Sequence, residues 1–218
     1  LNIKLHIISY NDDDFKDYLT TTRNFQEPYL DLAGFSLHML CKAAKKDGIK
    51  ILLNGTGADE FFGGYRRHLL AQKINWLPQV LHTWALSYLI SRSFLPPTKH
   101  ERTILKKHKK STFLKTVLDY DQHVYLENNN LKYTDGIGLY NNIEIRVPYL
   151  TPEITTWGLN QLNKNILGKI ELKEILYNYL PKKLIDRTKS GFALPIRSLK
   201  INTKDLRNKL LTDWLKQE

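Results

Sequence analysis

The first part of the chain, residues 1–65, alternates between short apolar segments and segments with helical periodicity. Residues 4–9 (KLHIIS) alternate apolar and polar positions and contain branched side chains, which predicts a strand. The Asn/Asp cluster at 11–14 predicts a helix N-terminus, and Phe15, Tyr18 and Leu19 follow at helical spacing. A second amphipathic helix is expected over residues 30–48. Its apolar face carries Leu32, Phe35, Leu37, Leu40 and Ala44.

Residues 49–54 (IKILLN) form a short, continuous apolar segment between Gly48 and Gly55. Continuous apolar character is typical of a parallel strand that is covered on both faces. From residue 66 onward the pattern is mostly helical, with helices expected over residues 76–90, 113–127, 169–179 and 198–216. The sequence therefore predicts an α/β fold, in which an α/β part (1–65) precedes a mainly helical part (66–218).

Composition narrows the function classes. Hydrophobic residues make up 42% of the chain and charged residues 25%, as in ordinary soluble globular proteins. No apolar run is long enough to span a bilayer, and no signal peptide opens the chain. Cys41 is the single cysteine, which excludes an intrachain disulfide and a cysteine-rich metal site. We expect a cytoplasmic protein with no membrane partner.

The net charge of +11 suggests anionic partners. Part of the excess is local, because the segment 92–115 contains one acid, Glu101, and eight basic residues: Arg92, Lys99, Arg102, Lys106, Lys107, Lys109, Lys110 and Lys115. This segment is either a nucleic-acid patch or the solvated face of a helix. The solvated helix is favoured, because few aromatic residues are interleaved with the charges to stack on bases.

The stretch ILLNGTGADEFFGGY (51–65) carries the candidate chemistry. Ligands of parallel sheets bind beyond the carboxyl ends of strands, where Gly55-Thr56-Gly57 is expected to lie. Glycines there allow tight turns and close approach of a phosphate. Asp59 and Glu60 would repel phosphate unless Mg²⁺ bridges them to it. The alternative is that the two carboxylates only favour the positive end of a helix.

Three ordered segments resemble the asparagine synthetase family. LLNGTGADEFFGGY (52–65) is similar to the family signature LSGEGADELFGGY, and NNIEIRVPYL (141–150) to xxxEVRVPFLD. GKIELKEILYNYLPKKLIDRTKSGFALP (168–195) is similar to GKxxLRxAxxxxLPxxIxxRxKxGFxxP. The resemblance implies a parallel-sheet core of the adenine-nucleotide α-hydrolase type, incomplete at its N-terminus, followed by a mostly helical region.

The resemblance also implies chemistry: a carboxylate is activated by ATP and Mg²⁺ as an acyl-adenylate, and ammonia or another amine then forms the amide. It implies that Asp59, with Glu60, holds Mg²⁺ and pyrophosphate, and that Lys169 stabilises the departing phosphate. Asn54, Gly55, Thr56 and Gly57 match positions lining the nucleotide pocket. The alternative for Lys169 is a surface lysine near a helix start, which the helix dipole disfavours.

The chain also departs from the family pattern. The pyrophosphate loop SGGxDS and the glutaminase domain have no counterpart in it, and residue 1 is Leu. We therefore expect a synthetase-domain fragment that is inactive alone, completed by a longer chain or a partner chain. Thr56 replaces the Glu of GEG, and a threonine hydroxyl is not a general base near neutral pH.

Two functions from different classes remain open. The first is an ATP-dependent, amide-forming enzyme that keeps adenylation and whose carboxylate is aspartate or another acid, with ammonia or an amine as second substrate. The second is a catalytically inactive family member that acts as a scaffold or interaction module, with nucleic acid as a less expected partner. Glu144 and Arg146 are either a buried ion pair or charges that face the substrate.

Overall fold

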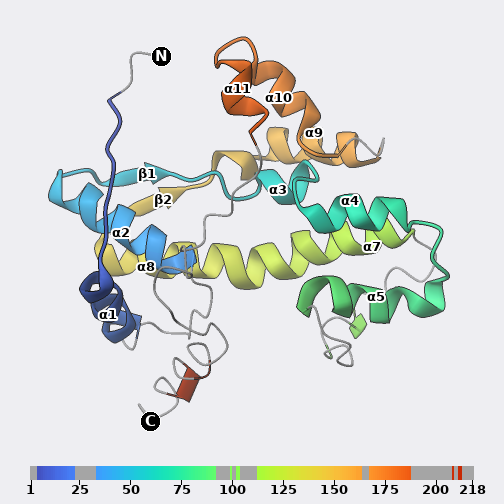
Figure 1. Cartoon of the computed structure of the whole chain (residues 1–218), viewed down its shortest axis with the longest axis horizontal. Helices are drawn as coiled ribbons and strands as arrows, with labels where there is room; N and C mark the ends of the chain where they lie inside the picture. Colours follow the sequence, from blue (N-terminus) through green and yellow to red (C-terminus); the bar gives the residue numbers. More distant parts are fainter. Residues whose placement is uncertain are drawn as a thin grey trace. The chain divides into compact units, whose positions relative to one another are not determined.

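The computed structural model describes residues 4–22, 33–91, 99, 102–103, 112–163, 167–187, 208 and 211–212. The chain divides into two compact units, each assembled from distant segments (Figure 1). Unit 1 comprises Leu1–Asn54, Asn129–Arg146 and Asp186–Glu218, and unit 2 comprises Gly55–Asn128 and Val147–Ile185. The helix expected over 198–216 and most of the basic segment 92–115 lie outside the described residues.

Unit 1 is a small α/β unit. Strands β1 (Ile51–Leu53) and β2 (Glu144–Arg146) pair in parallel, with Leu52 opposite Ile145. Helices α2 (Ala33–Lys46) and α8 (Lys132–Asn141) pack together beside this sheet, and α1 (Asp12–Thr21) packs on α2 (Figure 1). The expected parallel pairing of the apolar segment at 49–54 is thus confirmed within the described residues.

Helix α1 begins where the Asn/Asp cluster predicts. The Asn11 side chain accepts hydrogen bonds from the backbone N–H groups of Asp13 and Asp14, at 2.9 and 3.0 Å. The Asp14 carboxylate in turn accepts from the Asn11 backbone N–H at 2.9 Å. This reciprocal arrangement satisfies N–H groups that a helix terminus otherwise leaves without partners. Phe15 and Tyr18 are buried against Phe35 of α2.

Three sequence predictions for unit 1 are wrong. Residues 4–9 form no strand, because a strand needs a neighbour to share its backbone hydrogen bonds and this segment pairs with neither β1 nor β2. Leu5 and Ile7 are largely exposed as a result. Leu40 is also exposed rather than in the core of α2. The two-stranded sheet is covered on the Leu52 and Ile145 face alone in the described part, and Leu53 is 73% exposed.

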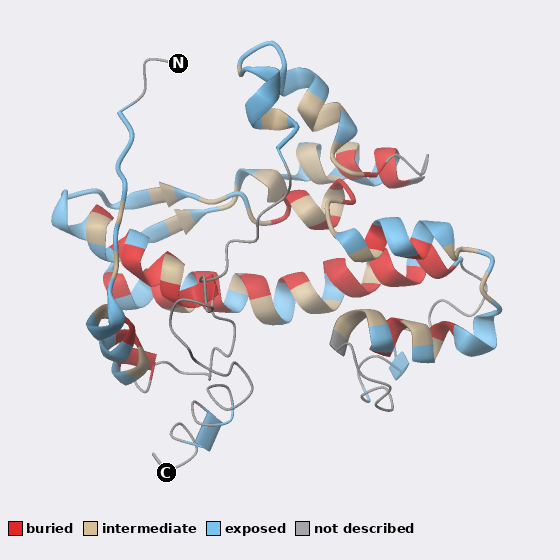
Figure 2. Cartoon of the chain, viewed as in Figure 1, coloured by how far each residue is buried: buried red, intermediate tan, exposed pale blue. Residues whose placement is uncertain are grey.

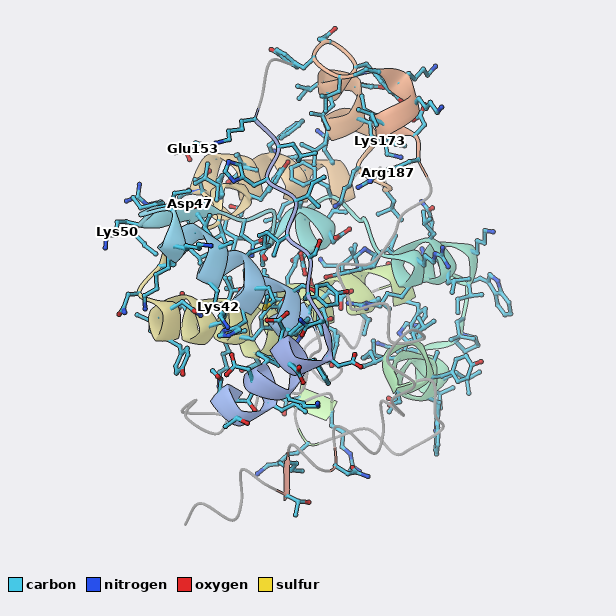
Figure 3. The ribbon with its side chains drawn as sticks, turned by 60° about the vertical axis from the view of Figure 1, so that its left-hand side comes forward. Lys42, Asp47, Lys50, Glu153, Lys173 and Arg187 are labelled. Carbon is cyan, nitrogen blue, oxygen red and sulfur yellow. The ribbon has the colours of Figure 1, made fainter. Side chains whose placement is uncertain are left out.

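Charged side chains occupy the outer side of unit 1. Lys42, Asp47 and Lys50 lie on the exposed side of α2 and of the turn that leads into β1 (Figure 3). Lys42 forms an ion pair with Asp17 at 3.0 Å, and both side chains are about half exposed. Such solvated pairs contribute little to stability. The stability of unit 1 therefore comes mainly from its buried apolar cluster.

Unit 2 is helical in its described residues, and it contains α3 (Ala58–Phe61), α4 (Arg66–Lys73), α5 (Gln79–Ser91), α7 (Phe113–Tyr120), η3 (Pro148–Leu150), α9 (Pro152–Asn163), α10 (Ile170–Leu176) and α11 (Lys182–Ile185). The π-helical stretch η2 (Asp121–Leu131) links α7 to α8. Helices α4 and α5 pack on α7, whose buried face is continuous (Figure 2). The helices expected near 76–90, 113–127 and 169–179 are confirmed.

No helix among the described residues is both long and apolar enough to cross a membrane.

The buried His38 side chain of α2 makes the stability of unit 1 depend on pH. Its Nδ1 atom lies 3.2 Å from Nδ2 of Asn141. Burial lowers the pKa of His38 from 6.5 to about 4, and the positive charge of Lys42 acts in the same direction. The unfolded chain therefore takes up a proton at higher pH than the folded chain.

We predict that the free energy of unfolding is highest above pH 6.5 and falls by up to about 3 kcal/mol through His38 as the pH decreases to about 4. Urea unfolding across this range checks it. In His38→Gln this part of the pH dependence should disappear, whereas His123→Gln, at an exposed position, should keep it. Equal slopes for His38→Gln and the parent chain would contradict the prediction.

Candidate functional site

The glycine-rich turn begins where β1 ends. The Asn54 backbone N–H donates to the Arg146 carbonyl oxygen at 2.8 Å, which extends the strand pairing by one residue. Gly55 is exposed and Thr56 is half-buried. Gly57 is buried with φ +96°, and a Cβ atom there would overlap the Leu150 side chain. This position therefore requires glycine for its left-handed conformation and for space.

Asp59 and Lys169 form an ion pair within unit 2. Asp59 lies on α3 directly after the glycine turn, and Lys169 precedes α10. The Lys169 Nζ atom is 3.0 Å from Oδ1 of Asp59, and the side chains are 29% and 24% exposed, respectively. The structure thus brings together the two residues for which the family resemblance implies a catalytic role. The pair is partly open to solvent, so a ligand oxygen can approach the ammonium group.

The backbone holds Lys169 in place. Its N–H donates to the Phe62 carbonyl oxygen at 3.0 Å, and the Gly168 N–H donates to the Gly63 carbonyl oxygen at 3.0 Å. Lys169 has φ +59° and ψ 32°, a left-handed conformation that destabilises a residue with a Cβ atom by about 1–2 kcal/mol. Such strain is found where the surrounding structure imposes it, often at functional sites.

Gly64 completes the surroundings of the ion pair. A Cβ atom on Gly64 would overlap both Oδ1 of Asp59 and the Lys169 side chain at Cε. The Gly64 N–H donates to the Asp59 carbonyl oxygen at 2.8 Å. Gly64, the second glycine of FGGY, therefore lets α3 and the turn at residue 169 approach each other. The sequence analysis did not assign this role to Gly64.

Glu60 has a different environment from Asp59. Its side chain is 1% exposed, and Oε1 accepts a hydrogen bond from the Tyr65 hydroxyl at 2.7 Å. Burial raises the pKa of the Glu60 carboxyl, although the Tyr65 hydrogen bond acts in the opposite direction. The Gln122 side-chain amide donates to the Glu60 carbonyl oxygen at 3.1 Å. Asp59 and Glu60, which the sequence analysis treats as a pair, thus have different partners.

A second ion pair lies beside Glu60, in which Asp121 is fully buried and the Arg67 side chain is 20% exposed. The Arg67 guanidinium donates from Nε and Nη2 to the two carboxylate oxygens of Asp121, both at 2.7 Å. Nε2 of His68 is 2.6 Å from Oδ2 of Asp121, which is fully buried. The guanidinium lies 4.0 Å from the Tyr65 ring centre and 4.8 Å from that of Tyr125. The sequence analysis missed this cluster, for which the single signal was the polar run RRH (66–68) that follows FGGY.

Two other expectations concern charges and metals. Glu144 and Arg146 form an ion pair at 2.7 Å on β2, with both side chains more than half exposed, so they are not a buried pair. Within the part of the chain that is described, no cluster of three or more His, Cys, Asp or Glu side chains has the arrangement of a metal site. Cys41 is fully buried in α2, where burial raises the pKa of its thiol to about 11.

Comparison with known proteins identifies the family of this chain. The family model described as asparagine synthase matches residues 1–218. The chain belongs to the asparagine synthase family. Its similarity to individual members of that family is low, and no solved structure matches it significantly.

Three relatives illustrate the similarity. The chain is 25% identical to asparagine synthetase [glutamine-hydrolyzing] 1 of Bacillus subtilis over 222 residues, which cover 80% of the chain and 35% of that protein. It is 26% identical to a putative asparagine synthetase [glutamine-hydrolyzing] of Mycobacterium tuberculosis, with coverages of 78% and 33%. For putative asparagine synthetase [glutamine-hydrolyzing] 1 of Methanocaldococcus jannaschii, the identity is 27% and the coverages are 73% and 24%. The chain thus spans about a third or less of these relatives.

The left-handed conformation of Lys169 gives a prediction that is independent of catalysis. Lys169→Gly and Lys169→Ala remove the same ammonium group, but only alanine keeps a Cβ atom in the strained conformation. Lys169→Gly should therefore be more stable than Lys169→Ala by about 1 kcal/mol, measured by urea unfolding. Equal stability of the two variants would show that the backbone at residue 169 is not constrained as described.

Proposed function

We propose that this chain forms part of a synthetase domain that activates a carboxylate with ATP and transfers the acyl group to ammonia or another amine. The carboxylate oxygen attacks the α-phosphorus, and the bond to the β-phosphate oxygen breaks with release of pyrophosphate. The amine then attacks the acyl carbon, which releases AMP and leaves the amide. The observation that carries the proposal is the Asp59–Lys169 pair beside the glycine turn, in a member of this family.

The Lys169 ammonium group supplies positive charge of the kind that pyrophosphate release needs. Negative charge grows on the bridging and terminal phosphate oxygens as the bond breaks, and a preorganised cation stabilises it. The ion pair with Asp59 is partly exposed, so a phosphate oxygen can replace the carboxylate as the partner of the ammonium group. Gly55, Thr56 and Gly57 of the same unit would then line the nucleotide, because the turn allows a close approach of the backbone.

The chemistry of the carboxylates tests the proposed Mg²⁺ site. Asp59 fits a Mg²⁺ ligand, since its carboxylate is partly exposed and faces the same space as Lys169. When bound, Mg²⁺ would supply positive charge to the phosphate oxygens. Glu60 does not fit, because its buried carboxyl accepts the Tyr65 hydroxyl hydrogen bond. Ammonia from a glutaminase domain or partner chain is part of the proposal, in line with the glutamine-hydrolyzing relatives.

The proposal predicts that Lys169→Ala reduces carboxylate-dependent pyrophosphate release by the intact protein by about 100-fold or more. Lys183→Ala, an exposed lysine of α11 in the same unit, is the matched control and should keep the parent rate. Pyrophosphate is measured with ATP, Mg²⁺ and a panel of carboxylic acids. Release by Lys169→Ala at the parent rate would remove the assigned role, and no release by the parent protein with any acid would refute the function.

Gly64→Ala tests the geometry of the pair while both charges are kept. The added methyl group overlaps the Asp59 carboxylate and the Lys169 stem, so the two side chains must separate. We expect at least about a tenfold lower rate of pyrophosphate release, because small displacements of a catalytic group are costly. Thermal unfolding should show a folded protein. An unchanged rate would mean that the spacing of Asp59 and Lys169 is unimportant.

A further inference from the structure

The short helix α3 carries Asp59 but has little stability of its own. It contains four residues, and no side chain caps its N-terminus at Gly57. Helices of this length are not stable without tertiary contacts. Contacts outside the helix must therefore fix the orientation of Asp59. In unit 2 they include the Gln122 hydrogen bond to the Glu60 carbonyl oxygen, the Gly64 hydrogen bond to the Asp59 carbonyl oxygen, and the Tyr65 hydrogen bond to the Glu60 carboxyl.

The Tyr65 side chain, whose hydroxyl donates to Glu60, is held in turn by the Arg67–Asp121 ion pair. The Tyr65 ring packs on one face of the Arg67 guanidinium, and Tyr125 lies within cation–π distance of the same group. Both carboxylate oxygens of Asp121 bind Arg67, in a planar geometry that a lysine would not reproduce. Contacts thus connect Asp121 through Arg67 and Tyr65 to Glu60, which is part of α3.

We propose that Glu60 and Tyr65 are positioning residues that orient Asp59 toward Lys169, and that Glu60 is not a metal ligand. The inference rests on the proposed function. Burial of Glu60 separates it from the partly exposed Asp59–Lys169 pair. Its adjacent position on the four-residue helix couples any movement of Glu60 to Asp59. The Arg67–Asp121 pair supports this arrangement by fixing the Tyr65 ring.

The Tyr65→Phe variant removes the hydroxyl and keeps the ring on Arg67. We expect kcat for pyrophosphate release to fall about tenfold or more while KM for ATP changes less than about threefold, because misplacement mainly weakens transition-state contacts. Tyr179→Phe, the same change at an exposed position of unit 2, is the control and should match the parent protein. A kcat of Tyr65→Phe equal to that of the parent protein, with or without a change in KM, would overturn the inference.

The Glu60→Gln variant separates a positioning residue from a metal ligand. Glutamine keeps an oxygen that accepts the Tyr65 hydrogen bond and removes the negative charge. We expect the calorimetric affinity for inorganic pyrophosphate with Mg²⁺ to stay within about threefold of the parent value, because the Tyr65 hydrogen bond is kept and a residue that does not bind the metal can lose its charge without weakening metal binding. An affinity about tenfold weaker or more would identify Glu60 as a ligand of the metal and overturn the inference.

The two variants together distinguish failure of the inference from failure of the proposed function. If Lys169→Ala abolishes pyrophosphate release and Tyr65→Phe does not reduce it, the function stands and the positioning role fails. If the parent protein releases no pyrophosphate with any acid, the proposed function fails. If Tyr65→Phe does not fold, as judged by thermal unfolding, the calorimetric result for Glu60→Gln still decides between positioning and metal binding.

Discussion

A buried carboxylate must be neutralised, and the helices of unit 2 are arranged to meet that requirement at Asp121. An unpaired charge at a fully buried position would destabilise the fold by several kcal/mol. Arg67 supplies two hydrogen bonds and His68 contacts the same carboxylate, so α4 is held against the junction of α7 and η2. The turn before α4, which carries the Tyr65 hydroxyl, is fixed by the same contacts.

The ion pairs Arg67–Asp121 and Asp59–Lys169 of unit 2 differ in the exposure of their carboxylates, which is 0% for Asp121 and 24% for Asp59, and therefore in what they can do. Breaking a buried pair such as Arg67–Asp121 costs on the order of 3–5 kcal/mol, whereas a solvated pair is worth about 1 kcal/mol or less. Asp59–Lys169 lies between these limits, with about a quarter of each side chain exposed. In the function that we propose, Lys169 therefore changes partners during the reaction, while Arg67 remains in place. Arg67 thus provides rigid support, whereas Lys169 provides a cation that can exchange its partner.

Features that depend on neighbouring residues could be predicted from the sequence, whereas most contacts between distant residues could not. The capping arrangement at Asn11 involves neighbouring residues, and the apolar segment at 49–54 has a strand's composition, so both were predicted correctly. The segment 4–9 also has a strand's composition, but pairing depends on a neighbouring strand that no local pattern reveals. Asp59 and Lys169 were both selected by resemblance, whereas Asp121 gave no signal. Burial of Glu60 depends on tertiary packing that the sequence of α3 does not encode.

The backbone at residue 169 argues for a role of the ammonium group beyond stability. Glycine or asparagine adopts the left-handed conformation more readily than lysine, and Gly168 precedes it in the same conformation. Two backbone hydrogen bonds to residues 62 and 63 fix this turn whatever side chain it carries. A purely structural turn would thus be more stable with glycine at 169. Lysine there combines about 1–2 kcal/mol of backbone strain with a cation held 3.0 Å from Asp59, which fits the role at a phosphate group that we propose for it.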